Sequence, residues 1–182
     1  MKITISDKLD FTKESLKKNR GILLIGALFI VIGGVLIYIA TGIENHIFLY
    51  IFGGIFIAFP LFIIVYTMPS SFMYYYEQAQ IKKYGSFTTA VITHKEIEDN
   101  SYTEKIDNRI ERIEELNYLI SFTFNYQNNE FVNSFYVNTK EAFEALKIGN
   151  SIPIKFLKTD PKKSSVRLIK LSKEIGLKID KS

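Results

Sequence analysis

Two long runs without a formal charge constrain this chain more than any other feature of its sequence. Residues 21–42 and 47–76 contain no Asp, Glu, Lys or Arg, and Glu44 is the one charged residue between positions 21 and 76. A helix rising about 1.5 Å per residue needs about 20 apolar residues to cross a hydrocarbon core of about 30 Å. Residues 21–42 meet this length, and so does the apolar part of the second run, residues 47–66. Since four residues separate the runs, they predict an antiparallel transmembrane hairpin within residues 21–67.

The distribution of Lys and Arg predicts how this hairpin is oriented. The first 20 residues carry six basic side chains, the link between the runs carries none, and Lys82 and Lys83 follow the second run. The positive-inside rule therefore predicts a multi-pass protein of the cell (inner, cytoplasmic) membrane with both termini in the cytoplasm and Glu44 outside. A cleaved signal peptide ending near Ala40 and Gly42 is the alternative, but the first run is longer than the usual 7–15-residue apolar region of such peptides.

Small residues in the two runs are candidates for close helix packing. They recur at helical spacings, and packing through small residues is a common device in lipid. The candidate helix-packing residues are Gly26, Gly33, Gly34, Gly54 and Ala58. They serve either the contact within the hairpin or the assembly of a homo-oligomer. Neither run contains an ionisable or amide side chain, so we do not expect an ion path or a transporter.

The residues beside the hairpin are expected to anchor it. Residues 1–20 form a basic cytoplasmic tail, whose lysines either set the topology or bind anionic lipid. Residues 68–84 form a juxtamembrane segment with Tyr74, Tyr75 and Tyr76 at the level of the membrane interface.

From residue 85 onward the apolar pattern changes to a period of two, which indicates strands. We expect strands at residues 87–94, 118–127, 131–138, 151–157 and 164–169. Residues Asn138–Glu141 resemble a capping box and predict a short helix after the third strand. Pro153 is expected to confine the fourth strand to an edge or a bulge. This order predicts an α+β membrane protein. The two-helix hairpin is followed by a small five-stranded OB-like β-barrel with one helix between strands three and four. An open sheet packed on the helix is the alternative. The cytoplasmic domain spans residues 85–170, and residues 171–182 form a C-terminal tail.

Residues 95–117 form a long insertion after the first strand. Ile106, Ile110 and Ile113 have the spacing i, i+4, i+7 and predict a short amphipathic helix. That helix either docks on the barrel or offers a surface to a partner or to lipid, so the three isoleucines are the candidate partner-binding residues. Its mixed charges argue against binding to an anionic membrane.

Taken together, several of these motifs resemble those of a bacterial family. They are Gly85 before Thr89–Ile92, the strand pair 118–124 and 131–137, Gly149 before the alternating Ile152, Ile154 and Phe156, and Asp160-Pro161 before Ser165-Val166. The pattern resembles the family called domain of unknown function 3592, over roughly residues 85–168 and the hairpin anchor. The resemblance implies one or two transmembrane helices joined to a small β-domain, and it implies no catalytic residues. A membrane hairpin followed by an OB-like barrel is, more distantly, similar to NfeD-like proteins, which implies scaffolding of a membrane assembly.

The composition excludes several classes of chemistry. The chain has no cysteine, which excludes a disulfide scaffold, a cysteine zinc site and a thiol enzyme. Its two histidines, His46 and His94, lie on opposite sides of the membrane in the predicted topology, so a histidine metal site or a catalytic triad lacks its partners. From Met68 onward 17 basic residues face 15 acidic ones, a balance that disfavours nucleic acid. We therefore expect no enzyme activity, no catalytic residues, no cofactor and no metal.

The sequence thus predicts a non-enzymatic bacterial inner-membrane protein. Its hairpin tethers a small β-barrel-like protein-interaction domain at the cytoplasmic face. Its expected partners are the lipid bilayer and another (membrane) protein. The alternative is an accessory or immunity-type protein that acts through the hairpin itself on another membrane protein.

Overall fold

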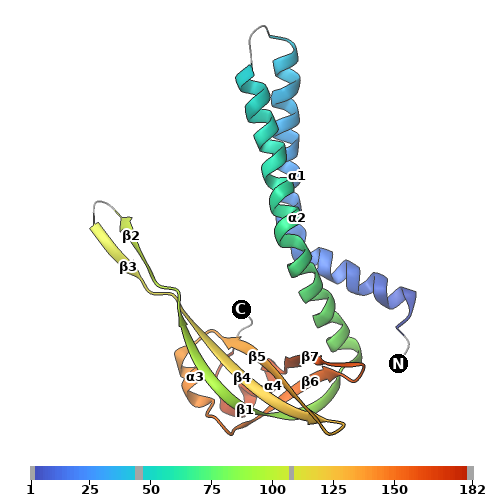
Figure 1. The fold of residues 1–182 in the computed structure, drawn as a ribbon, viewed down its shortest axis with the longest axis vertical. Helices are drawn as coiled ribbons and strands as arrows, with labels where there is room; N and C mark the ends of the chain where they lie inside the picture. The colour runs from blue at the N-terminus through green and yellow to red at the C-terminus, as the bar shows by residue number, and fades with distance from the viewer. Residues whose placement is uncertain (1–2, 44–46, 107–108, 180–182) are drawn as a thin grey trace. The chain divides into compact units, whose positions relative to one another are not determined.

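The computed structural model describes residues 3–43, 47–106 and 109–179, and the chain divides into two compact units, Met1–Gln80 and Ile81–Ser182. Helices α1 (Ile5–Thr41) and α2 (Ile47–Tyr84) make up the first unit, apart from the end of α2 (Figure 1). Each contains a stretch long and apolar enough to cross a membrane. The expected outer-loop residue Glu44 lies outside the described residues.

Both helices extend beyond the predicted spans. Residues 5–20 of the expected basic N-terminal tail are helical, because α1 begins at Ile5 with a complete capping box. The Thr4 hydroxyl accepts a hydrogen bond from the Asp7 amide, and the Asp7 carboxylate accepts one from the Thr4 amide at 2.8 Å. The juxtamembrane segment 68–84 is likewise the continuous end of α2, which passes through Pro60 and Pro69.

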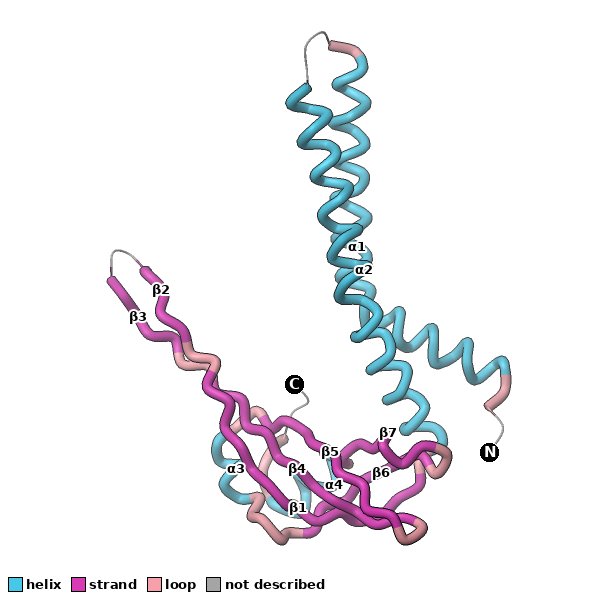
Figure 2. The backbone as a smooth tube through the Cα atoms, in the orientation of Figure 1, coloured by secondary structure: helices cyan, strands magenta, loops and turns pink. Residues whose placement is uncertain are grey.

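The second unit is built on a five-stranded antiparallel sheet. Its strands are β1 (Ser86–Asp99), β4 (Leu116–Tyr126), β5 (Asn129–Val137), β6 (Ser151–Leu157) and β7 (Asp160–Val166). They are ordered β5-β4-β1-β6-β7, and helix α3 (Lys140–Ala145) lies between β5 and β6 in the chain (Figure 2). The predicted α+β layout of five strands, with one helix between the third and the fourth, is confirmed. The strands of the prediction correspond to β1, β4, β5, β6 and β7 in chain order.

The sheet curls until its two edges nearly meet. No ladder joins β5 to β7 in the described residues, and the side chain of Asn133 on β5 bridges them instead. Its amide donates to the Ser164 hydroxyl at 2.9 Å and to the carbonyl of Lys162 at 3.2 Å. The result is a barrel-like sheet closed at this point by one side chain.

The core fills the inside of this curled sheet. Alternate residues of β4 point inward, so Tyr118, Ile120, Phe122 and Phe124 are buried while the residues between them are more exposed, as the period of two predicts. The remaining buried residues come from β1, β5, α3, β6 and β7, and from the C-terminal segment.

The C-terminal segment is part of this core. Residues 168–175 form helix α4 (Leu168–Ile175), and both Leu171 and Ile179 are buried in the cluster. The expectation of a tail at residues 171–182 is therefore wrong for the described residues up to 179. An α-left conformation at Gly176, with φ of 69°, ends α4 and lets the chain return to the core.

Candidate functional site

A two-stranded arm extends from the curled sheet and is the most exposed part of the second unit (Figure 2). We define the arm as residues 95–117. Strands β1 and β4 stay paired to the end of the sheet at Asp99 and Leu116, and β2 (Tyr102–Ile106) and β3 (Arg109–Ile113) continue as a separate two-stranded ladder. The arm is thus a long hairpin held by the sheet at one end.

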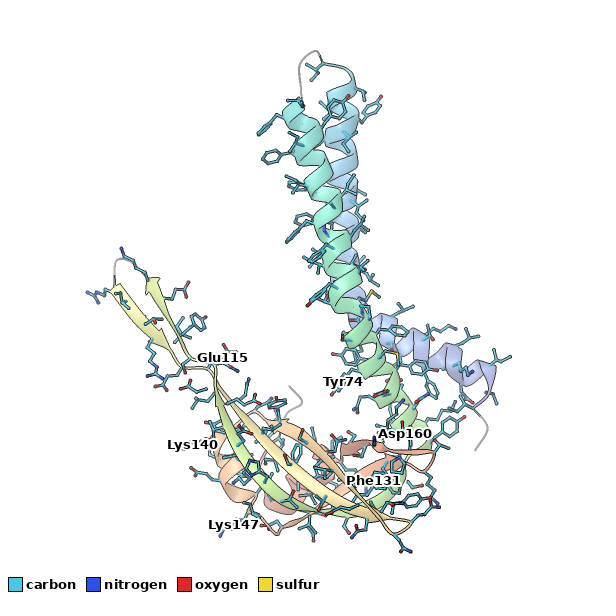
Figure 3. All side chains as sticks on the ribbon, viewed as in Figure 1. Tyr74, Glu115, Phe131, Lys140, Lys147 and Asp160 are labelled. Carbon is cyan, nitrogen blue, oxygen red and sulfur yellow. The ribbon has the colours of Figure 1, made fainter. Side chains whose placement is uncertain are left out.

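Side chains and backbone groups bridge the joint between the two ladders. The Asn100 amide donates to the Glu115 carbonyl at 2.8 Å, and the Glu115 amide donates to the Ser101 hydroxyl at 3.1 Å. The Asp99 carboxylate accepts from the Ser101 amide at 2.9 Å and from Arg112 at 3.3 Å. Figure 3 labels Glu115 at this joint. These four bonds keep the hairpin continuous where the ladder changes.

The expectation of a helix in this insertion is wrong. Ile110 pairs with Lys105 and Ile113 pairs with Tyr102, and residues paired across antiparallel strands share a face. Ile110 and Ile113 therefore lie on opposite faces of the arm. Ile106 pairs with Arg109 through its backbone, and its side chain is outside the described part of the chain. The three isoleucines do not form the single apolar stripe that the helical spacing predicts.

The arm instead presents apolar side chains on both faces. Ile110 is 78% exposed and Tyr102, on the other face, is 50% exposed. Tyr102 is a residue that the sequence reasoning missed. The signal that could have identified this strand is its content of Tyr102, Thr103 and Ile106, which are residue types that favour strands.

The arm has a negative net charge, although the net charge of the whole chain is positive. It contains eight acidic and four basic residues, a net charge of −4, whereas the whole chain carries +4, so the remaining residues carry +8. The ladder places Glu104 directly opposite Glu111. Like charges in this position destabilise a strand pair. The free arm therefore contains an unfavourable pair that a cationic group would relieve.

Two ionisable groups at the base of the arm are perturbed. Tyr136 on β5 donates to the Glu98 carboxylate at 3.2 Å, and this hydrogen bond is the main cause of a raised Tyr136 pKa. The pKa of Asp99 is lowered, chiefly by the hydrogen bonds from Ser101. A hollow of about 420 Å³ opens beside Tyr136 and is lined by Leu116, Asn117, Tyr136, Val137 and Asn138.

The hairpin of α1 and α2 uses only part of the predicted packing set. Gly26 and Gly33 are buried between the helices, and a Cβ on Gly33 would lie 2.7 Å from the Gly53 carbonyl oxygen. Gly53, which the prediction did not include, makes the reciprocal contact at 2.8 Å from the Gly33 oxygen. The remaining three candidates, Gly34, Gly54 and Ala58, are exposed along the hairpin, and a Cβ added to Gly34 or Gly54 would have nothing within 4 Å.

Among the described residues, no group of three or more His, Asp and Glu side chains is arranged to hold a metal ion. His94 is exposed on β1, with its Nε2 4.0 Å from the Glu96 carboxylate, and His46 lies outside the described residues. Comparison with models of protein families, with curated proteins and with solved structures gives no match to this chain in any of the three.

Proposed function

We propose that this chain is a membrane-tethered protein-interaction domain of a bacterial inner membrane, and that the arm is its recognition element. In this proposal α1 and α2 span the membrane, both termini are cytoplasmic, and the curled sheet is an OB-like barrel. The strand order and the position of α3 support the OB-like description, and the length and hydropathy of the two helices support the span.

One observation carries the proposal: beyond Asp99 and Leu116 the arm continues as the separate two-stranded ladder of β2 and β3, and among the described residues no third strand pairs with either edge of this ladder. A two-stranded hairpin alone in water is marginally stable, because it buries too little apolar surface to offset the loss of conformational entropy. This one nonetheless exposes Ile110 and Tyr102, and it opposes Glu104 to Glu111. The exposed apolar side chains and the repulsion between Glu104 and Glu111 both destabilise the free arm. A partner that covers the arm explains why it has these features better than the stability of the free chain does.

The charge of the arm indicates the chemistry of its partner. With a net charge of −4 and exposed apolar side chains, the arm fits a basic protein surface that also offers an apolar contact. Open strand edges add the option of main-chain pairing with an extended segment of that partner.

The test is photo-crosslinking in native membranes with the full-length protein. A photoreactive residue at Ile110 should capture a discrete partner, and the same residue at the exposed Lys147, outside the arm, is the matched control. The captured band should disappear when unlabelled full-length protein competes for the partner and persist when the competitor has residues 95–117 replaced by a Gly-Ser linker. Equal capture at both positions, or equal competition by both proteins, would refute the arm as the recognition element.

The exposed small residues of the hairpin favour a second candidate function. Gly34 and Gly54 each follow an interface glycine by one residue, and in an antiparallel pair this places both on the same side of the hairpin. Ala58 lies one turn further along α2. A further transmembrane helix could approach closely there, as expected for an accessory or immunity-type protein that acts through its hairpin. In that case the partner would be lost on substituting Gly34 and Gly54 by Leu and kept when the arm is replaced.

A further inference from the structure

The first four turns of α1 carry an exposed apolar stripe that neither proposed function uses. Ile5, Leu9 and Leu16 are 80%, 55% and 39% exposed. At 100° per residue these three side chains fall within about 40° of one another on the helix surface. They therefore form one narrow stripe along the segment 5–20.

The contacts of this segment with α2 fix which way the stripe faces. Phe11 packs edge-on against Tyr76 with ring centroids 5.6 Å apart. The Ser15 hydroxyl donates to the Phe72 carbonyl at 3.2 Å, and the Ser71 hydroxyl donates to the Asn19 side-chain oxygen at 2.7 Å. Phe11, Ser15 and Asn19 are all buried, so the segment cannot roll over to cover the stripe without breaking these contacts.

Basic side chains flank the stripe, while acidic ones lie further round the helix. At 100° per residue, Lys8 lies on one side of the stripe and Lys13 and Arg20 lie on the other. Asp10 and Glu14 fall at least about 100° from the centre of the stripe by the same geometry. An apolar stripe bordered by long cationic side chains is typical of a helix that lies in a bilayer interface, since such side chains reach up to the headgroups.

We propose that residues 5–20 of α1 form an interfacial membrane helix. Ile5, Leu9 and Leu16 insert between lipid headgroups and the upper acyl chains, and Lys8, Lys13 and Arg20 contact lipid phosphates. The segment ends at Gly21, where the uncharged run begins, and Figure 1 shows α1 bending between this segment and the part paired with the start of α2. The inference rests on the proposed membrane span, and it adds a second, shallow membrane contact to that span.

The test uses the absence of tryptophan from the chain. Full-length Leu9→Trp is reconstituted in phosphatidylcholine–phosphatidylglycerol nanodiscs, with Asp10→Trp, at an exposed position on the same segment, as the matched control. We expect blue-shifted emission for Leu9→Trp and strong quenching by lipids brominated close to the headgroup. Asp10→Trp should emit at longer wavelengths than Leu9→Trp and be quenched more weakly. Emission from Leu9→Trp that is blue-shifted but unquenched would show that protein covers the stripe and would overturn the inference.

A third variant separates this inference from the span. Val31 is exposed within the uncharged part of α1, so Val31→Trp should be quenched most by lipids brominated near the chain ends. If Val31→Trp is quenched and Leu9→Trp is not, the interfacial helix is wrong and the span stands. If Val31→Trp is not quenched, the span itself fails and the inference fails with it.

Discussion

Gly33 and Gly34 are adjacent in the sequence, but Gly33 is buried against α2 and Gly34 is exposed. A Cβ on Gly33 would lie 2.7 Å from the backbone oxygen of Gly53, whereas a Cβ on Gly34 would have nothing within 4 Å. We expect Gly33→Ala to push the helices apart and cost about 1–3 kcal/mol of stability, the range for overpacking a fitted interface. Gly34→Ala should be neutral or slightly stabilising, because Ala favours a helix over Gly.

Unfolding of the two full-length variants in mixed detergent micelles compares these costs directly. Because both replacements add the same methyl group to neighbouring residues of one helix, the intrinsic helix propensity changes equally in both variants. Equal stability of the two variants would contradict the Gly33–Gly53 contact.

The helix-packing residues show how much of the contact between α1 and α2 can be predicted from the sequence. The seven-residue spacing identified Gly26 and Gly33, which are buried, but the small-residue rule also selected Gly34, Gly54 and Ala58, which are exposed. The rule says that small residues permit close approach; it does not give the rotation of each helix, which all side chains of the pair decide together. Pro153 is a similar case. Its strand was expected at an edge or with a bulge. Strand β6 instead lies between β1 and β7, its ladder with β7 begins one residue after Pro153, at Ile154, and the irregularity of that ladder lies between Phe156 and Leu157.

Among the elements, the arm allows its folding to be separated from its binding. Glu111→Lys replaces the repulsive pair with Glu104 by an attractive one, which should stabilise the β2–β3 ladder by about 0.2–1 kcal/mol. Amide hydrogen exchange in residues 102–113 should slow by up to about fivefold. If the acidic arm recognises a basic partner, the same variant should bind that partner more weakly although its arm is better ordered.

Glu114→Lys is the control for this variant, because it makes the same change of charge outside the ladder. Equal slowing of exchange in both variants would mean that net charge, and not the cross-strand pair, governs the order of the arm.

The joint of the arm should respond to acid. The pKa of Asp99 is lowered from its ordinary value of 3.8, chiefly by hydrogen bonds from Ser101 and further by Arg112. A lowered carboxyl pKa stabilises the folded form above the ordinary value, and this contribution is lost as the pH falls through the lowered pKa. We expect protection of the Ser101 and Glu115 amides, corrected for intrinsic exchange rates, to be constant near neutrality and to fall below pH 3.8.

Asp99→Asn removes the titrating group from this joint. Its protection at neutral pH should be lower because the charged partner of Arg112 is gone, and the acid step should disappear. An acid step of the same size in Asp99→Asn would assign the effect to another carboxylate.

The arm is also the element that the sequence predicts least well. The i, i+4, i+7 spacing of Ile106, Ile110 and Ile113 fits a helix. Residues 102–106 contain Tyr, Thr and Ile, which favour strands, but neither they nor residues 109–113 alternate in polarity. Local pattern left both options open. The continuous pairing of β1 with β4, which lie far apart in the sequence, decides between them because it brings the ends of the insertion together. By contrast, β4 follows from strict alternation, which is a local signal. The helix between β5 and β6 was also predicted locally, but its cap is Thr139 and not the expected Asn138, since the Thr139 hydroxyl accepts a hydrogen bond from the Ala142 amide at 3.3 Å.

For the whole molecule, the buried cluster predicts where the second unit ends. Leu171 and Ile179 are 1% and 7% exposed and belong to the core, so a fragment of residues 81–182 should fold cooperatively without detergent. A fragment of residues 81–170 lacks both side chains and should be less stable by at least about 2 kcal/mol, the lower end for losing one buried aliphatic side chain. Urea denaturation followed by circular dichroism measures this difference.

Leu171→Ala in the longer fragment is the matched comparison, because it removes one of the two side chains and keeps the chain length. If the shorter fragment is as stable as the longer one, α4 does not contribute to the core.

The division into two units was predictable because charge is distributed so unevenly along the chain. One charge in residues 21–76 against 41 in the rest separates two kinds of surface, and this contrast needs no knowledge of long-range contacts. The outer limits of the units were not predictable in the same way. Residues 5–20, 68–84 and 168–179 are of mixed polarity, and their structure depends on packing against residues far away in the sequence.

Strand β1 also has a mechanical consequence. Only Gly85 separates it from the end of α2, and from there it runs through Ala90 and Ile92 of the core and out into the arm. At about 3.4 Å per residue, the ten residues 97–106 extend about 30 Å. Tension along this strand loads its ladders with β4 and β6 in shear, so many hydrogen bonds share the force. A partner that pulls on the arm therefore pulls on the central strand β1, and β1 transmits this tension through Gly85 to the last turn of α2.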